Sequence, residues 1–156
     1  MVFQNFNLWA HMTVLENVIE APMQVLKLSK AQAIEQAEKL LQKVGLIEKK
    51  NIYPAYLSGG QQQRVAIARA IVNKPKYLFC DEPNSGLDPK TAIVIDNLIK
   101  EITEEYDITT VINTHDMNSV MEIGERIIFL KEGILAWEGT KKDIFKTDLK
   151  KCCNQN

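Results

Sequence analysis

The sequence predicts an α/β fold in which a mostly helical first half precedes strands that alternate with helices. Two observations lead to this prediction. Up to about residue 72, apolar residues recur at helical spacing behind recognisable helix caps. After residue 73, short apolar runs that end in polar residues alternate with further helical patterns, as in a parallel sheet. The 156 residues are enough for one domain with a real core.

The first half opens with two capped helices. Thr13 and Glu16 form a capping box for the first helix, which is expected to stop before Pro22. Ser29 caps the second helix, and Gly45 follows its end. The apolar stripe of the second helix consists of Ala33, Ile34, Ala37, Leu40, Leu41 and Val44.

A third helix is expected from Gly60 to about Val72, after which the pattern changes. The runs YLFCDEP and ITTVINTH are typical of buried parallel strands. Between them Asp88 caps a helix that has Pro89 at its first position. The inner face of that helix is expected to consist of Ile93, Leu98, Ile99 and Ile102.

Shorter elements and the cysteines complete the chain. A helix is expected over Met117 to Ile123, a hairpin from RIIFL and ILAWE around KEG, and a last helix over Lys141 to Lys146. Cys80 lies in an apolar run and is expected to be a small buried hydrophobe, whereas Cys152 and Cys153 stand in a polar tail. This spacing fits neither a zinc site nor a disulfide framework.

Charge and hydropathy exclude several classes of function. With a net charge of −1, the chain lacks the excess of positive charge that is typical of proteins that bind nucleic acid or an anionic membrane. No apolar run approaches the length of a membrane span, and the N-terminus MVFQNFNLWAHM lacks the features of a signal peptide. We therefore expect a cytosolic protein with no nucleic-acid partner.

The stretch LSGGQQQR, residues 57 to 64, can bind an anion. Ser58 can cap the helix that follows, while Gly59 and Gly60 let the backbone approach a ligand closely. A helix N-terminus also offers free N–H groups and a partial positive charge to a phosphate. Taken alone, the three residues SGG fit an ordinary helix start better than an anion site.

Polar residues that could take part in a reaction follow both apolar strands. Asp81 ends the first strand, where a carboxylate can hold Mg²⁺ through water at the carboxyl edge of the sheet. Glu82 comes next and could orient or deprotonate an attacking water. His115 follows the second strand at the same edge, where an imidazole could contact a γ-phosphate or the attacking water. Each residue alone is also explained by a solvated turn or a polar strand end.

Together these motifs resemble the ATP-binding-cassette (ABC) ATPase family over nearly the whole chain, to about Asp148. They occur in the order of a glutamine after a strand, LSGGQ, a strand ending in DE, SGLD, and a strand ending in TH. The resemblance implies ATP and Mg²⁺ as cofactors. It also implies a partial P-loop NTPase fold, with a helical subdomain and an incomplete RecA-like core.

The resemblance also assigns roles to individual residues. Gln4 is similar to the Q-loop glutamine and Asp81 to the Walker B aspartate, which together bind Mg²⁺ in the family. Glu82 resembles the catalytic glutamate, and His115 the switch histidine that positions the γ-phosphate. Asp88 resembles the D-loop aspartate at the dimer contact. The family signature, which closes over the ATP of the facing subunit, matches Ser58, Gly59, Gly60 and Gln61.

The sequence departs from the family at one motif. The family's glycine loop, GxxxxGK followed by Ser or Thr, wraps the β- and γ-phosphates, and none of the seven glycines begins that pattern. The chain therefore resembles the C-terminal part of a nucleotide-binding domain. The expected division is a helical signature subdomain over about 5–72, a RecA-like core over about 1–4 and 73–148, and a polar tail over 149–156.

Two parts of the chain resemble two kinds of transporter. The part through LSGGQQQRVAIARA is similar to the ATP-binding subunits of histidine and other polar amino-acid permeases. The part with NKPKYLFCDEPNSGLDPKT and DITTVINTHDMNSVMEIG is similar to lipid-transport cassettes of the Mla type. The change falls between about Ala66 and Asn73. Because the family's helical subdomain touches the membrane subunit, the first part favours polar amino-acid import.

The resemblance implies an ATP-hydrolysing subunit on the cytoplasmic face of the cell membrane. A permease would bind the helical subdomain and the Q-loop, and a second, complete ATPase domain would form the dimer partner. Three alternatives stay open. The first is an Mla-type lipid-transport ATPase, and the second is a non-catalytic module that docks on a partner and completes its site with the signature loop. The third, a DNA-repair ATPase, is disfavoured by the nearly neutral charge.

The absence of a glycine loop yields a prediction for the 156-residue chain by itself. Without that loop most phosphate contacts and the lysine charge are missing, so the isolated chain should show no useful ATP affinity and no ATPase activity. Calorimetric titration of the purified chain with ATP measures this affinity. Micromolar binding would contradict the prediction.

Overall fold

The computed structural model describes residues 1–144 and divides into two compact units, Met1–His115 and Asp116–Asn156. The first unit holds two parallel strands and the long helices of the chain. Its helices are α1 (Val14–Val25), α2 (Lys30–Lys43), α3 (Gly59–Ile71) and α4 (Pro89–Glu105), and its strands are β1 (Tyr77–Asp81) and β2 (Thr109–Asn113). Two short 3-10 helices, Ile47–Lys49 and Pro54–Tyr56, lie between α2 and α3.

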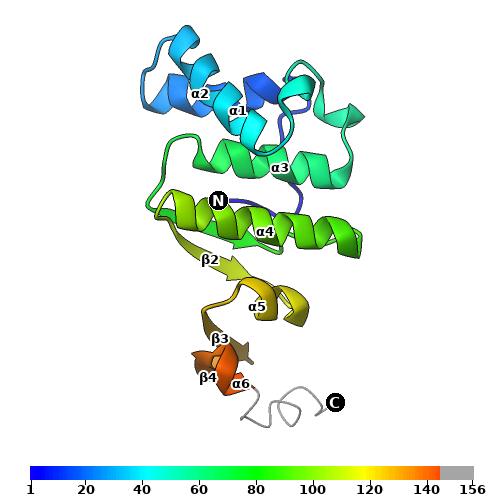
Figure 1. Cartoon of the computed structure of the whole chain (residues 1–156), viewed down its shortest axis with the longest axis vertical. Coiled ribbons are helices and arrows are strands. Elements are labelled where there is room, and N and C mark those ends of the chain that lie inside the picture. Colours follow the sequence, from blue (N-terminus) through cyan, green and yellow to red (C-terminus); the bar gives the residue numbers. More distant parts are fainter. Residues whose placement is uncertain (145–156) are drawn as a thin grey trace. The chain divides into compact units, whose positions relative to one another are not determined.

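The helices of the first unit pack around α3 (Figure 1). Helices α1 and α2 pack against each other and against α3, and α3 also packs against α4. Helix α3 can serve several neighbours because buried residues lie on much of its surface, among them Val65, Ala66, Ile67 and Ala68. A helix that is apolar on most sides is stable only inside a core, which explains its central position.

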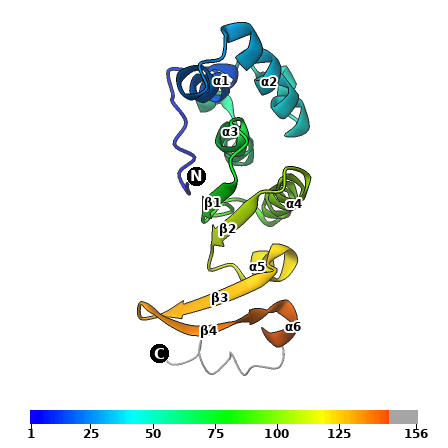
Figure 2. The same ribbon diagram turned by 90° about the vertical axis from the view of Figure 1, so that its left-hand side faces the viewer.

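The strands of the first unit form a small parallel sheet. Strands β1 and β2 pair in register from Tyr77↔Thr109 to Asp81↔Asn113. On the other side of β1, Val2 donates its N–H to the Phe79 carbonyl at 2.7 Å and accepts from the Asp81 N–H at 2.9 Å. Figure 2 shows α4 on one side of the two strands. Three chain segments therefore run in the same direction and end at the same edge of the sheet.

Most predicted elements of the first unit are confirmed. The capping box at Thr13 forms, Ser29 caps α2, and the apolar stripe of α2 faces the core. The predicted stop before Pro22 is wrong, because α1 continues to Val25 with Pro22 inside it. Pro22 has no N–H to donate within the helix, but its carbonyl still accepts from the Leu26 N–H at 3.1 Å, and burial of the residue offsets the cost of a proline inside a helix.

The faces of α4 and of the strands differ in part from expectation. Ile93 was predicted on the inner face of α4 but is 56% exposed, because the buried stripe is set by Ile95, Leu98, Ile99 and Ile102. Leu78 and Cys80 are buried as expected, whereas Tyr77, Phe79 and Val111 are exposed in the described part of the chain. The strands are thus covered on one face only. Burial raises the pKa of the Cys80 thiol to about 12, which makes it an inert core residue.

The second unit begins with α5 (Met117–Ile123) and continues with β3 (Arg126–Lys131), β4 (Ile134–Thr140) and α6 (Lys141–Ile144). Strands β3 and β4 form the predicted antiparallel hairpin, with a register shift between Phe129 and Leu130. The predicted end of the last helix at Lys146, the polar tail 149–156 and the pair Cys152–Cys153 lie outside the described residues. Among residues 1–144, no helix combines the length and apolar character needed to cross a bilayer.

Gly60 allows α3 to approach α4 closely. A Cβ at this position would lie 2.3 Å from Cγ2 of Thr91, which is too close for any side chain. The Thr91 rotamer is fixed in turn, because its hydroxyl donates to the Asp88 carboxylate at 2.5 Å. Gly60 is buried, and the neighbour that leaves no room for a side chain at this position is Thr91 of α4.

This contact predicts that Gly60→Ala lowers the free energy of unfolding by about 1–3 kcal/mol through overpacking. In a Thr91→Ser background the clashing methyl is absent while the hydroxyl remains. There Gly60→Ala should stabilise by up to about 1 kcal/mol, because alanine is the better helix former. Chemical denaturation of the full-length protein and its single and double variants measures both values. Equal costs in the two backgrounds would show that Thr91 is not the obstacle.

Candidate functional site

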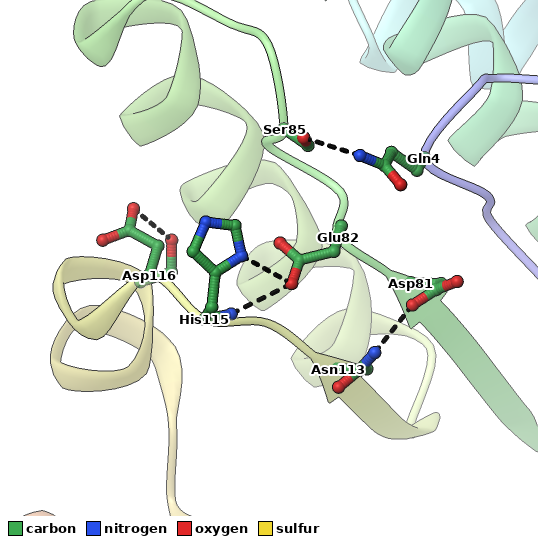
Figure 3. Close-up of polar contacts among 8 residues, drawn as sticks. Gln4, Asp81, Glu82, Ser85, Asn113, His115 and Asp116 are labelled. Carbon is green, nitrogen blue, oxygen red and sulfur yellow. Dashed lines mark hydrogen bonds and ion pairs between the residues drawn. The ribbon is translucent and has the colours of Figure 1, made fainter. Parts of the chain in front are cut away.

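Polar side chains meet at the carboxyl edge of the small sheet (Figure 3). Asp81 and Glu82 come from the end of β1, and Asn113 and His115 come from the end of β2. Gln4 follows the Val2 segment and donates from Nε2 to the Ser85 hydroxyl at 2.9 Å, across 81 residues of sequence. The structure therefore brings together four residues that the sequence singled out, Gln4, Asp81, Glu82 and His115.

Glu82 and His115 are joined by two hydrogen bonds. The His115 backbone N–H donates to Glu82 Oε1 at 3.0 Å, and His115 Nδ1 lies 2.8 Å from the same oxygen. The Glu82 side chain is 19% exposed and that of His115 is 84% exposed. Both hydrogen bonds from His115 end on Oε1 of Glu82. The histidine therefore orients the carboxylate through one oxygen and does not bond to Oε2. A carboxylate held in this way can accept a proton or a hydrogen bond from water.

The backbone of Glu82 adopts a left-handed conformation with φ 47°. This region is uncommon for residues other than glycine and persists only where neighbouring structure stabilises it. Here the Glu82 N–H donates to the Asn113 carbonyl at 2.8 Å, and the Glu82 carbonyl accepts from the Ser85 N–H at 3.1 Å. The two backbone hydrogen bonds thus hold Glu82 in a conformation that turns its side chain out of the strand alternation.

Asn113 is a site residue that the sequence analysis missed. Its Nδ2 donates to Asp81 Oδ1 at 2.8 Å. In a parallel pair, residues in register place their side chains on the same face, so Asn113 lies beside Asp81 because the two are register partners. The signal was present in the sequence as a polar residue at the end of an apolar strand, but its partner depended on the strand register.

Gln63 and Asn84 support the turn that follows Glu82, and both were also missed. Gln63 is fully buried and donates from Nε2 to the Pro83 carbonyl at 2.7 Å. Asn84 donates from Nδ2 to the buried Asp96 carboxylate at 2.6 Å. The helical period could have placed Gln63 in the core, because positions three and four residues later in α3 are buried alanine and isoleucine.

The segment after Gln4 is fixed by Arg69 of α3. The guanidinium donates to the carbonyls of Phe6 at 2.9 Å and Asn7 at 2.7 Å, and it lies 5.3 Å from the centre of the Trp9 ring. Burial lowers the pKa of Arg69 from its usual value. Phe6 and Asn7 both have positive φ, so these bonds stabilise an unusual backbone path directly beyond Gln4.

The signature residues form a separate part of the candidate site. Ser58 caps α3 and shares a capping box with Gln61, whose Oε1 also accepts from Lys49 at 3.2 Å. Asp88 caps α4 through the backbone N–H groups of Lys90 and Thr91. The hydrogen bonds between Ser58 and Gln61 stay within this first turn of α3.

The cluster contains oxygen donors that suit Mg²⁺. Asp81 presents a carboxylate with only one oxygen engaged by Asn113, and Gln4 contributes an amide that can turn its oxygen to a ligand. Residues 1–144 hold no group of three or more His, Cys, Asp or Glu that could bind a metal. Mg²⁺ commonly binds one or two protein oxygens and completes its shell with water and phosphate, so these residues fit it.

Comparison with known proteins gives consistent matches. A family model described as ABC transporter matches residues 1–85. The probable ABC transporter ATP-binding protein PEB1C of Campylobacter jejuni is 49% identical over 145 residues, which cover 93% of this chain and 60% of that protein. The histidine/lysine/arginine/ornithine transport ATP-binding protein HisP of Escherichia coli is 49% identical over 146 residues, or 93% of this chain and 56% of its own length.

A solved structure agrees with these relatives. The ATP-binding cassette MJ0796, in a dimeric post-hydrolysis state bound to ADP and Pi, superposes with a TM-score of 0.79 at 41% identity. The match covers 90% of this chain and 61% of that one. The chain thus spans less than two thirds of the length of the proteins it matches.

The cap of α4 yields a pH prediction. The Thr91 hydroxyl, with the Thr91 and Lys90 N–H groups, lowers the pKa of Asp88 below its usual 3.8. A lowered carboxyl pKa stabilises the fold above 3.8, and this contribution is lost as the pH falls through the lower folded-state value. Asn also caps helices but carries no charge, so Asp88→Asn isolates this effect. The wild-type melting temperature should exceed that of Asp88→Asn at neutral pH, and the difference should vanish in acid. A constant difference at all pH values would exclude the charge as its cause.

Proposed function

Because the chain belongs to the ABC transporter family, we propose that it forms part of an ATP-hydrolysing subunit that powers polar amino-acid import. The support for amino acids comes from relatives such as HisP, whose name specifies histidine, lysine, arginine and ornithine transport. The match to HisP extends over 93% of the chain, including both the part that resembles amino-acid permeases and the part that resembles lipid-transport cassettes.

The observation that carries the proposal is the Glu82–His115 pair at the edge where Asp81 also lies. In this site Glu82 orients the attacking water and accepts its proton, and His115 contacts the γ-phosphate. The paired hydrogen bonds to Oε1 support these roles, since they fix the carboxylate relative to the histidine.

Asp81 and Gln4 would hold Mg²⁺, through their carboxylate and amide oxygens. When bound, the ion neutralises charge that develops on the phosphates. Gln4 donates to the Ser85 hydroxyl through Nε2, and its Oε1 is the atom that would bind the ion. The same segment is attached to α3 by Arg69, which would couple Gln4 to the helical subdomain.

The signature residues and Asp88 act, in this proposal, on the ATP of a facing ATPase domain. Ser58, Gly59, Gly60 and Gln61 stand at the N-terminus of α3, where N–H groups and the helix dipole favour an anion. The dimeric state of MJ0796 supports such an arrangement. The glycine loop that wraps the phosphates would come from outside these 156 residues.

The proposed subunit lies on the cytoplasmic face of the membrane and binds a permease. The helical subdomain, about 5–72, and the Q-loop around Gln4 would make that contact, while about 1–4 and 73–148 would form the nucleotide-binding core. Exposed apolar residues are available on this subdomain for a partner, including Val25, Leu26, Ile52, Tyr53 and Tyr56.

The proposal predicts that Glu82→Gln reduces ATP hydrolysis at least about 100-fold, because the general base is lost. The full-length subunit, assembled with its permease in proteoliposomes, is assayed for phosphate release and for ATP binding, which should persist. Glu104→Gln, an exposed change of the same type on α4, serves as the matched control. Unchanged turnover in Glu82→Gln would instead support a non-catalytic docking module.

The same preparation tests the transported substrate. Hydrolysis should rise when polar amino acids are supplied through the transport system, and it should not respond to added phospholipid. The opposite response would favour the lipid-transport alternative.

A further inference from the structure

We propose that Asn113 is a positioning residue for ATP hydrolysis, which orients the metal-binding carboxylate of Asp81. The inference rests on the proposed function, since it concerns the same site. It assigns a task to a residue outside the motifs that identified the family. Three observations support it: the register of β1 and β2, the hydrogen bonds of Asn113 to Asp81 and Glu82, and the orientation of the Glu82 carboxylate by His115.

The register places the side chain of Asn113 beside Asp81. The two residues are paired in the last position of the parallel ladder between β1 and β2. Their side chains therefore stand next to each other at the carboxyl edge, and Asn113 Nδ2 donates to Asp81 Oδ1 at 2.8 Å. A valine or isoleucine, which a strand would usually prefer, could fill this position but could not donate.

The hydrogen bond makes the two oxygens of Asp81 inequivalent. Oδ1 is engaged by the amide, which restricts rotation of the carboxylate and leaves Oδ2 for the ion or its bound water. Partners of this kind hold a ligating group in the productive orientation and increase its affinity for the metal. Without the amide, Asp81 can rotate about its terminal bond, because this torsion has no sharp preference of its own.

Asn113 contacts Glu82, the proposed general base, through its backbone. Its carbonyl accepts the Glu82 N–H at 2.8 Å, which stabilises the left-handed backbone at Glu82. This bond belongs to the main chain and survives a change of side chain. The Glu82 carboxylate is oriented by His115, and the turn beyond it is attached to Gln63 through Pro83. Removing the Asn113 amide should therefore disturb Asp81 and leave Glu82 in place.

The selective effect distinguishes positioning from a merely structural role. Asn113→Leu should raise the Mg²⁺ concentration for half-maximal hydrolysis about 10-fold. At saturating Mg²⁺, kcat should recover to near the wild-type value, because Glu82 and His115 are unaffected. Asn113→Gln, which keeps an amide donor, should restore part of the lost metal affinity. A loss of stability alone would lower kcat at every metal concentration.

Metal binding without turnover provides the second readout. The full-length subunit in its transporter complex carries Glu82→Gln, and Mn²⁺ binding in the presence of ATP is followed by electron paramagnetic resonance. Asn113→Leu in this background should weaken Mn²⁺ binding about 10-fold. Asn97→Leu, the same change at an exposed position in the middle of α4, should leave it unchanged.

Three results would overturn the role of Asn113. The first is an unchanged Mn²⁺ affinity in Asn113→Leu, and the second is an equal loss in Asn97→Leu. The third is a uniform fall of kcat, with a lower melting temperature and no rescue by Asn113→Gln. In all three the wild-type complex still hydrolyses ATP, so the proposed function stands. If the wild-type complex neither hydrolyses ATP nor binds Mn²⁺ with ATP, the proposed function fails, and the role of Asn113 fails with it.

Discussion

Parallel pairing of three chain segments is the constraint on which the candidate site depends. The Val2 segment, β1 and β2 run in the same direction, so the residues that follow them gather at one edge of the sheet. Gln4, Asp81 and His115 come from distant parts of the sequence and have no local reason to meet. A shift of one residue between β1 and β2 would separate Asp81 from Asn113 and turn their side chains to opposite faces. The ladder itself is short, which makes the buried contacts of Val2, Leu78 and Cys80 with the core essential for its register.

Helix α3 connects the parts of the site that the sheet does not. Near its start, Gly60 touches Thr91 of α4, and one turn later Gln63 bonds the turn after Glu82. Near its end, Arg69 binds the segment that follows Gln4. A single helix thus carries Gly60 and contacts both the turn after Glu82 and the segment after Gln4. Movement of this helix would therefore displace residues at each of these places.

The adjacent carboxylates of Asp81 and Glu82 have different hydrogen-bond partners. An amide donor contacts Asp81 from the neighbouring strand, whereas a backbone N–H and an imidazole contact Glu82. The left-handed backbone at Glu82 directs its side chain away from the alternation of the strand and towards His115. Two acids that are neighbours in sequence can in this way serve separate purposes, one toward a metal ion and the other toward water. The difference arises from their partners, because both are aspartate- or glutamate-type carboxylates of similar intrinsic chemistry.

The amino-acid sequence by itself determined the caps at Thr13, Ser29, Ser58 and Asp88, the parallel strands, the hairpin and the order of motifs that shows the family. The helix caps and the helices can be predicted from sequence because a cap or an apolar period involves residues only three or four positions apart. Only the tertiary structure decided that α1 continues through Pro22, that Ile93 faces outward and that Gly60 is required by Thr91. It also decided the partners of Asn113 and Gln63, which lie 32 and 20 residues away. The physical reason is that packing and strand register bring together residues that are distant in sequence. A local sequence pattern does not specify which distant residue will be the neighbour.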